Sequence, residues 1–131
     1  MKLNRKVGAT SQVWQIYIQD SSSTTGGGLT GLVYNTAGLT AYYKRNNQSS
    51  WTAITLVTMT AGSFTSSGFV QSDSTVAPGW YDFCPPDACF SSGSSVGFHL
   101  KGATNMAPLP IEVDLQAQVD VAFVNAVATS S

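Results

Sequence analysis

The sequence has 131 residues, which is enough for one domain with a hydrophobic core but leaves no room for a comfortable second domain. Only 10% of the residues are charged, against about 25% in typical soluble domains, and Ser, Thr and Gly take up the difference. The net charge of −1 implies no nucleic-acid partner. A surface with so little charge lacks the repulsion that keeps monomers apart, so it suits a subunit of an assembly.

The chain opens with a small basic cluster of Lys2, Arg5 and Lys6. We expect residues 1–11 to form a basic N-terminal arm, either a solvated tail or an arm that docks on a neighbouring subunit. The cluster is not followed by the apolar region of a secretory signal, and every apolar run is far shorter than the ~20 residues that span a bilayer. We therefore expect assembly in a cytoplasm, without a membrane partner.

Alternation of apolar and polar side chains predicts seven short strands, each with one buried face. They cover residues 13–18, 39–43, 51–60, 68–71, 79–83, 96–101 and 111–115. In the first strand Trp14, Ile16 and Ile18 share a face. In the longer third strand Ile54 and Leu56 share one face, while Val57 and Met59 share the other.

These strands are separated by turn-forming residues, and no long helix is predicted. The pattern predicts an antiparallel β-sandwich over residues 12–116, with a small barrel as the alternative. Pro85, Pro86 and Asp87 can open a helix, so a short helical turn is expected near residues 85–90.

The apolar segment 117–131 fits two conformations. Its residues alternate as a strand would, but some of them also have helical spacing, so strand and helix both stay open. Such a segment packs on its own domain or joins a neighbouring chain. This makes Val121, Phe123 and Val124 candidate subunit contacts.

The residues offer little for catalysis or metal binding. Cys84, Cys89 and the single His99 are too few for a structural zinc site, and the two thiols either stay free or form a local disulfide. The segment 26–31 spells G-x-G-x-x-G, but no acid follows where a dinucleotide site needs one. No G-x-S-x-G motif accompanies His99. We therefore predict no catalytic residues, no cofactor and no metal.

Most of the large aromatic residues are expected in the core. Tyr17 and Tyr42 fall on the more polar sides of their strands, which makes them further candidate subunit contacts. Stacking on a carbohydrate is the rival use of outward aromatic residues.

Three stretches resemble, in their order and spacing, tailed-bacteriophage virion proteins, and in particular the N-terminal β-sandwich domain of phage upper baseplate proteins. They are residues 16–43, residues 68–88 with APGWYDFCPPDA at their end, and residues 100–115 beginning LKGATNMAPLPIE. The resemblance implies an Ig-like antiparallel β-sandwich without catalytic residues, located in the virion.

Three functional classes follow from these observations. The first is a structural virion subunit attached to the tail or baseplate as an adaptor or fibre anchor, with capsid decoration as its close alternative. Its partners would be other virion proteins and further copies of itself in a homo-oligomer. A carbohydrate- or receptor-binding module is the second class, and an enzyme is the third, disfavoured by the shortage of ionisable residues.

Overall fold

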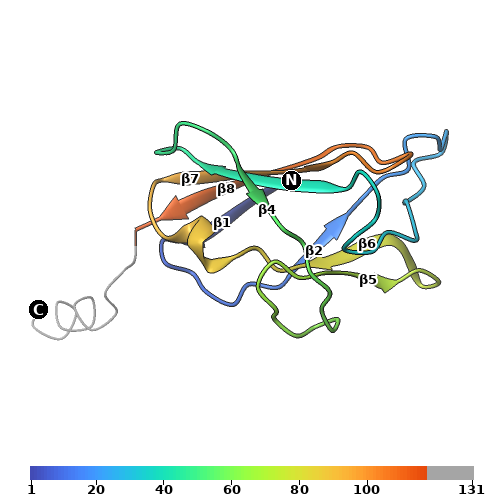
Figure 1. Cartoon of the computed structure of the whole chain (residues 1–131), viewed down its shortest axis with the longest axis horizontal. Helices are drawn as coiled ribbons and strands as arrows, with labels where there is room; N and C mark the ends of the chain where they lie inside the picture. Colours follow the sequence, from blue (N-terminus) through green and yellow to red (C-terminus); the bar gives the residue numbers. More distant parts are fainter. Residues whose placement is uncertain (118–131) are drawn as a thin grey trace, which may run out of the picture.

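The computed structural model describes residues 1–117, which form two β-sheets packed face to face (Figure 1). The five-stranded sheet has the order β1-β8-β7-β3-β4, and the three-stranded sheet has the order β2-β6-β5. The strands of this part of the chain are β1 (Lys2–Lys6), β2 (Trp14–Tyr17), β3 (Thr40–Arg45), β4 (Thr52–Ile54), β5 (Phe69–Asp73), β6 (Ala77–Phe83), β7 (Ser95–Lys101) and β8 (Leu109–Gln116). One 3-10 turn, η1 (Asp87–Phe90), confirms the helical turn predicted near residues 85–90.

The strand order is that of an immunoglobulin-like sandwich. The three-stranded sheet corresponds to strands B, E and D, and the series β8-β7-β3-β4 corresponds to G, F, C and C′. The sheets are separate layers, so the prediction of an all-β sandwich is confirmed and the barrel alternative is wrong.

The N-terminal segment differs from the prediction. Residues 2–6 are a strand of the larger sheet, not an arm: β1 runs parallel to β8, with Lys2 opposite Glu112 and Lys6 opposite Gln116. The amide of Val7 continues this ladder by donating to the carbonyl of Gln116 at 2.8 Å. Because only Leu3 and Val7 supply apolar side chains here, the alternation is too short to predict this eighth strand.

The predicted strand 51–60 is also interrupted. β4 is only three residues long, and the chain then crosses to the other sheet, where Val57 pairs with Gly68 as an isolated parallel bridge (Figure 1). Ile54 and Leu56 are buried as predicted, and Met59 is buried as well. The alternating run 51–60 therefore pairs first with the larger sheet and then with the smaller one, and it closes one side of the sandwich.

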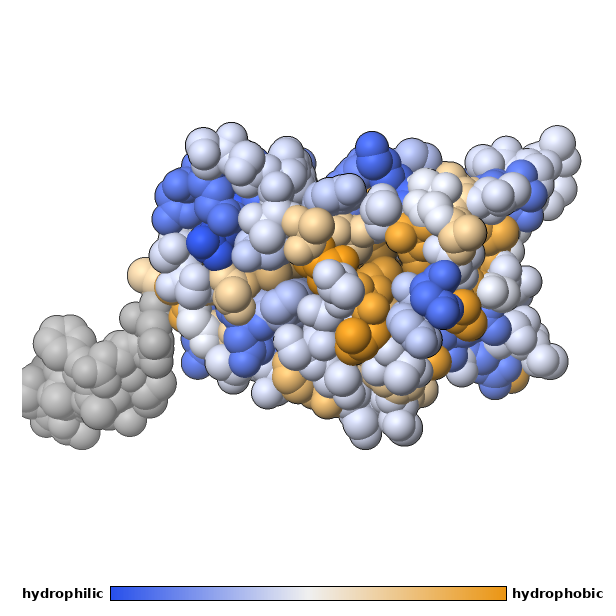
Figure 2. Space-filling view, in the orientation of Figure 1, coloured by the Kyte–Doolittle hydropathy of each residue, from blue (hydrophilic) through white to orange (hydrophobic). Residues whose placement is uncertain are grey.

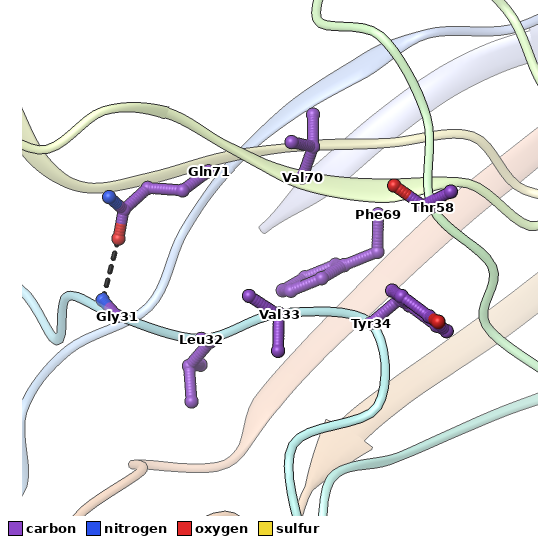
Figure 3. Close-up of a pocket in the computed structure, with 8 residues that line it drawn as sticks. All are labelled: Gly31, Leu32, Val33, Tyr34, Thr58, Phe69, Val70 and Gln71. Carbon is purple, nitrogen blue, oxygen red and sulfur yellow. Dashed lines mark hydrogen bonds between the residues drawn. The ribbon is translucent and has the colours of Figure 1, made fainter.

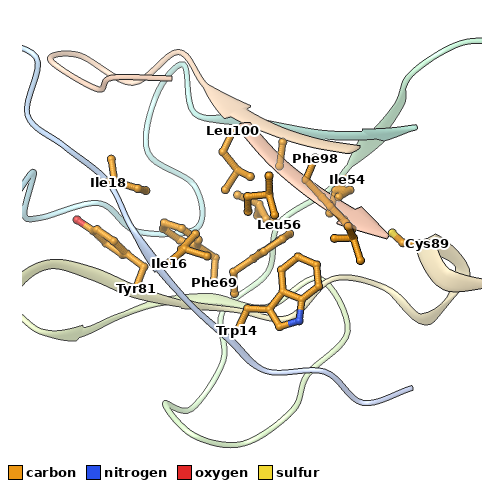
Figure 4. Close-up of a cluster of buried hydrophobic side chains, with 14 of the residues drawn as sticks. Trp14, Ile16, Ile18, Ile54, Leu56, Phe69, Tyr81, Cys89, Phe98 and Leu100 are labelled. Atoms are coloured by element: carbon orange, nitrogen blue, oxygen red, sulfur yellow. The ribbon is translucent and has the colours of Figure 1, made fainter. Parts of the chain in front are cut away.

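A cluster of aromatic side chains joins the two sheets at the middle of the core (Figure 4). We call Trp14, Phe83, Phe90 and Phe98 the aromatic centre. The ring of Phe98 in β7 lies edge-on to Trp14 at 5.0 Å and to Phe83 at 6.1 Å, measured between centroids. Each such pair contributes about 0.5–1.5 kcal/mol beyond the burial of its surface. Aromatic packing thus joins β2 and β7, the strands that a disulfide joins in antibody domains.

Both cysteines are free thiols that are fully buried. The Cys84 sulfur lies 3.7 Å from the sulfur of Met59, whereas Cys89 belongs to the main core (Figure 4). The two side chains therefore have separate surroundings, and the structure contains the free-thiol form.

Candidate functional site

The outer face of the five-stranded sheet carries a shallow hollow of about 360 Å³. Tyr42 in β3 and His99 in β7 are register neighbours, and both alternate with buried residues, so they point outward together. Lys101 follows two residues after His99 on the same face, and Trp51 comes just before β4. We call Tyr42, Trp51, His99 and Lys101, which line this space, the aromatic hollow.

Trp51 extends over the outer face of the sheet as far as residue 97, which has no side chain. The strand order places β3 between β4 and β7, so the indole reaches across β3 to lie over Gly97. A Cβ atom at position 97 would be only 3.2 Å from Cη2 of Trp51. The end of the six-membered ring therefore lies close to the backbone of Gly97, and Trp51 remains 51% exposed. Gly97 therefore makes room for an aromatic platform.

Charged side chains surround this platform unequally. Lys44 and Glu112 are the register neighbours of Gly97 on its two sides, and Lys101 lies at the hollow itself. Lysine thus outnumbers glutamate on this part of the outer face, and Lys101 is the charged residue that lines the hollow. The balance favours an anionic ligand in the hollow.

The outer face of the three-stranded sheet holds a second aromatic pair. The rings of Tyr17 and Trp80 lie 5.7 Å apart, and the Tyr17 hydroxyl donates to the carbonyl of Gly26 at 2.8 Å. Tyr17 is therefore held by its own domain, and Trp80 remains 41% exposed.

One side of the sandwich is free of charge. Between Asp20 and Asp73 the only charged residues of the sequence are Lys44 and Arg45. Residues 29–38 and 52–72, which we call the uncharged flank, line the open edges of β4 and β5. Figure 2 shows hydrophobic residues gathered at the centre of this side of the molecule.

Within the uncharged flank, a groove of about 240 Å³ lies between residues 31–34 and β5 (Figure 3). Val33 is 53% exposed beside the buried ring of Phe69. The amide of Gly31 donates to Oε1 of Gln71 at 2.6 Å, and this bond fixes the loop against β5. The groove is therefore preformed.

The predicted subunit contacts do not come together in one site. Tyr17 and Tyr42 lie on opposite outer faces, and the three basic residues lie on β1. Val121, Phe123 and Val124 lie outside the described residues.

Each basic residue of β1 has a different environment. The ammonium of Lys2 lies 3.6 Å from the Asp114 carboxylate. Arg5 donates from Nε to Oε1 of Gln12 at 2.7 Å and stacks over Trp14, so it serves its own domain. Lys6 is exposed.

Trp51 and Trp80 are surface residues that the sequence analysis did not single out, because most large aromatic residues were expected in the core. Their residue type favoured burial, but the alternation carried the opposite signal. Trp51 is out of phase with Ile54, and Trp80 is out of phase with Tyr81. Strand phase would have identified both.

Other polar groups contribute to the fold. Asp82, the buried acid of β6, accepts hydrogen bonds from the Gly62 amide at 2.8 Å and the Ser72 hydroxyl at 2.7 Å. Burial raises the pKa of the Cys89 thiol to about 12, which keeps it protonated. These groups hold loops and core together.

The glycine-rich segment packs closely on the β5–β6 hairpin. Gly28 lies so near Pro78 and Gly79 that a Cβ there would collide with their backbone. Within residues 1–117, the loop after this segment contains no helix whose N-terminus could face a phosphate.

Residues 1–117 contain no group of three or more His, Cys, Asp or Glu side chains close enough to hold a metal ion. In the same range there is no helix with the length and hydrophobicity to cross a membrane.

Comparisons of the chain with protein-family models, with curated proteins and with solved structures found no match.

Proposed function

We propose that this protein is a non-enzymatic structural component of a bacteriophage virion, attached to the tail or baseplate as an adaptor or fibre-anchoring module. The resemblance of residues 16–43, 68–88 and 100–115 to phage virion proteins supports this role. The sandwich fold is the one that the resemblance implies.

The uncharged flank is the observation that carries the proposal. Covering it with a neighbouring subunit removes Val33, Tyr34 and Val57 from water without stripping water from any charge. Fully burying an apolar side chain of this size stabilises by about 1.5–3 kcal/mol, and half-exposed ones contribute part of that. The edge of β4, and the part of the edge of β5 beyond the contact of Phe69 with Val57, add backbone groups that a neighbouring strand can pair with.

Capsid decoration uses the same surface with a different partner. In either role, other virion proteins and further copies of this chain are the expected neighbours. The position of the protein on the particle separates the two roles.

Cryo-electron microscopy of particles from a phage that encodes this chain tests the proposal. Density for the sandwich at the tail or baseplate supports the adaptor role, and density on the capsid shell identifies a decoration protein. Purified particles that lack the protein would overturn both.

A charge placed on the flank tests the docking surface itself. Val33→Lys or Val57→Lys is expected to reduce incorporation into particles by at least ~10-fold, equivalent to about 1.4 kcal/mol of contact. The matched control is Val76→Lys, which makes the same change at a hairpin turn where the side chain is 81% exposed. Equal incorporation of all three variants would show that the flank is not the docking surface.

A further inference from the structure

Trp51 lines the aromatic hollow with 51% of its surface exposed, and the outer end of its six-membered ring lies over Gly97. The negative face of an aromatic ring attracts the weakly positive C–H groups that line one side of a pyranose ring. A platform of this kind therefore suits a sugar ring stacked parallel to the sheet.

Polar groups stand around this platform where the hydroxyls of such a ring would lie. The Tyr42 hydroxyl and the His99 imidazole, which line the hollow, both donate and accept hydrogen bonds. The volume of about 360 Å³ lies at the lower end of the ~300–1,000 Å³ typical of small-molecule sites. A short saccharide fits this combination of an apolar floor and a polar rim.

Charge selects among saccharides. Among residues 1–117, the only ion pair with both partners within 4 Å joins Lys2 to Asp114, so Lys101 at the hollow is left to meet a ligand. We infer that the aromatic hollow binds an anionic saccharide, with a pyranose stacked on Trp51 and its carboxylate paired with Lys101. This site goes beyond the structural role proposed above and does not depend on it.

Titration of the purified full chain with two tetrasaccharides tests the inference. One alternates glucuronate with N-acetylglucosamine, and the other contains N-acetylglucosamine alone and so lacks carboxylates. Indole fluorescence and amide NMR shifts report binding. We expect the anionic probe to bind at least ~10-fold more tightly, with shifts centred on residues 97–101.

Three variants assign the contacts. Trp51→Ala is expected to weaken binding of the anionic probe at least ~10-fold, and Trp51→Phe should recover part of the loss. Lys101→Gln should bring the two probes to within ~3-fold of each other, because it removes the charge and keeps the stem. The matched control is Trp80→Ala, which deletes an exposed tryptophan on the opposite face and should leave binding unchanged.

Absence of saturable binding up to about 10 mM of either probe would overturn the inference. Equal losses in Trp51→Ala and Trp80→Ala would also overturn it. If Trp51→Ala instead lost incorporation into particles while the parent protein bound no saccharide, the hollow would be a subunit contact and the inference would be wrong. The docking variants Val33→Lys and Val57→Lys should keep saccharide binding, so the two proposals fail separately.

Discussion

Phe98 and Trp51 lie on the two faces of the same five-stranded sheet, and their surroundings could hardly differ more. Phe98 points inward and contacts rings from both sheets, with 1% of its surface exposed. Trp51 points outward, lies over Gly97 and keeps 51% of its surface exposed. The buried ring of Phe98 stabilises the fold, whereas the exposed surface of Trp51 is available to contact a ligand. Large aromatic residues thus need strand phase, not residue type, to be assigned a role.

The sharpest test of this difference truncates both rings. Phe98→Ala is expected to lower the free energy of unfolding by about 3–5 kcal/mol, because it opens a cavity in the aromatic centre. Trp51→Ala is expected to lower it by only about 1 kcal/mol, because Trp51 keeps 51% of its surface exposed in the folded protein. Urea unfolding of both variants measures the two values, and similar losses would contradict the comparison.

The stability of the protein at alkaline pH reports how well the core around Cys89 is shielded from water. Burial raises the pKa of the Cys89 thiol to about 12, while an unfolded chain titrates near ~8.5. Above about pH 8.5 the unfolded state releases a proton that the folded state keeps. The free energy of unfolding should therefore fall by up to about 1.4 kcal/mol per pH unit there, and the contribution is fully present at lower pH.

Urea unfolding at several pH values between 7 and 11 measures this slope. Cys89→Ala should make it shallower, and the raised pKa values of Cys84 and Tyr81 leave a remainder. A slope that is unchanged in the variant would show that Cys89 is not shielded.

Trp80 on the other outer face lies between these two cases, because it is exposed to solvent but also contacts the ring of Tyr17. Trp80→Ala removes a ring contact at 5.7 Å, which corresponds to about 0.5–1.5 kcal/mol of stability. Val76→Ala, at a more exposed position, should cost less than about 0.5 kcal/mol. Thermal unfolding of the two variants gives the difference, and a loss above about 3 kcal/mol for Trp80→Ala would mean that this ring belongs to the core.

The smallest effect is expected at the exposed ion pair of β1. Lys2→Met should change the free energy of unfolding by less than about 0.5 kcal/mol, because solvent screens the 3.6 Å pair with Asp114. Unfolding of parent and variant at low and high salt measures the change. A loss above about 1.5 kcal/mol would show that charge, rather than strand pairing, holds β1 in place.

Most of the strands could be predicted from the local alternation of apolar and polar residues. In β7, and in β8 from Ile111 onward, each inward residue is buried as its phase predicts, as Val96 and Ile111 illustrate. β1 was missed because its inner face offers only Leu3 and Val7, with Arg5 between them. The crossing after Ile54 was missed because the alternation continues unbroken while the chain changes its partner sheet.

The aromatic hollow was predicted in part. Tyr42 was identified from its polar strand face, whereas Trp51 was not singled out among the aromatic residues. The pairing of Tyr42 with His99 depends on the register between β3 and β7, which are distant in sequence. The alternation of apolar and polar residues within one strand does not predict that register. The role of Gly97 depends on the same pairing, so no motif could reveal it.

The position of β8 between β1 and β7 has a consequence for the order in which the sheet is made. β1 leaves the ribosome first, yet the strand it pairs with begins only at Leu109. Residues 2–6 therefore have no strand partner until almost the whole described chain has been synthesised. Closing such a long loop slows folding. β8 pairs with both β1 and β7, so neither of these two ladders can form before β8 has been synthesised.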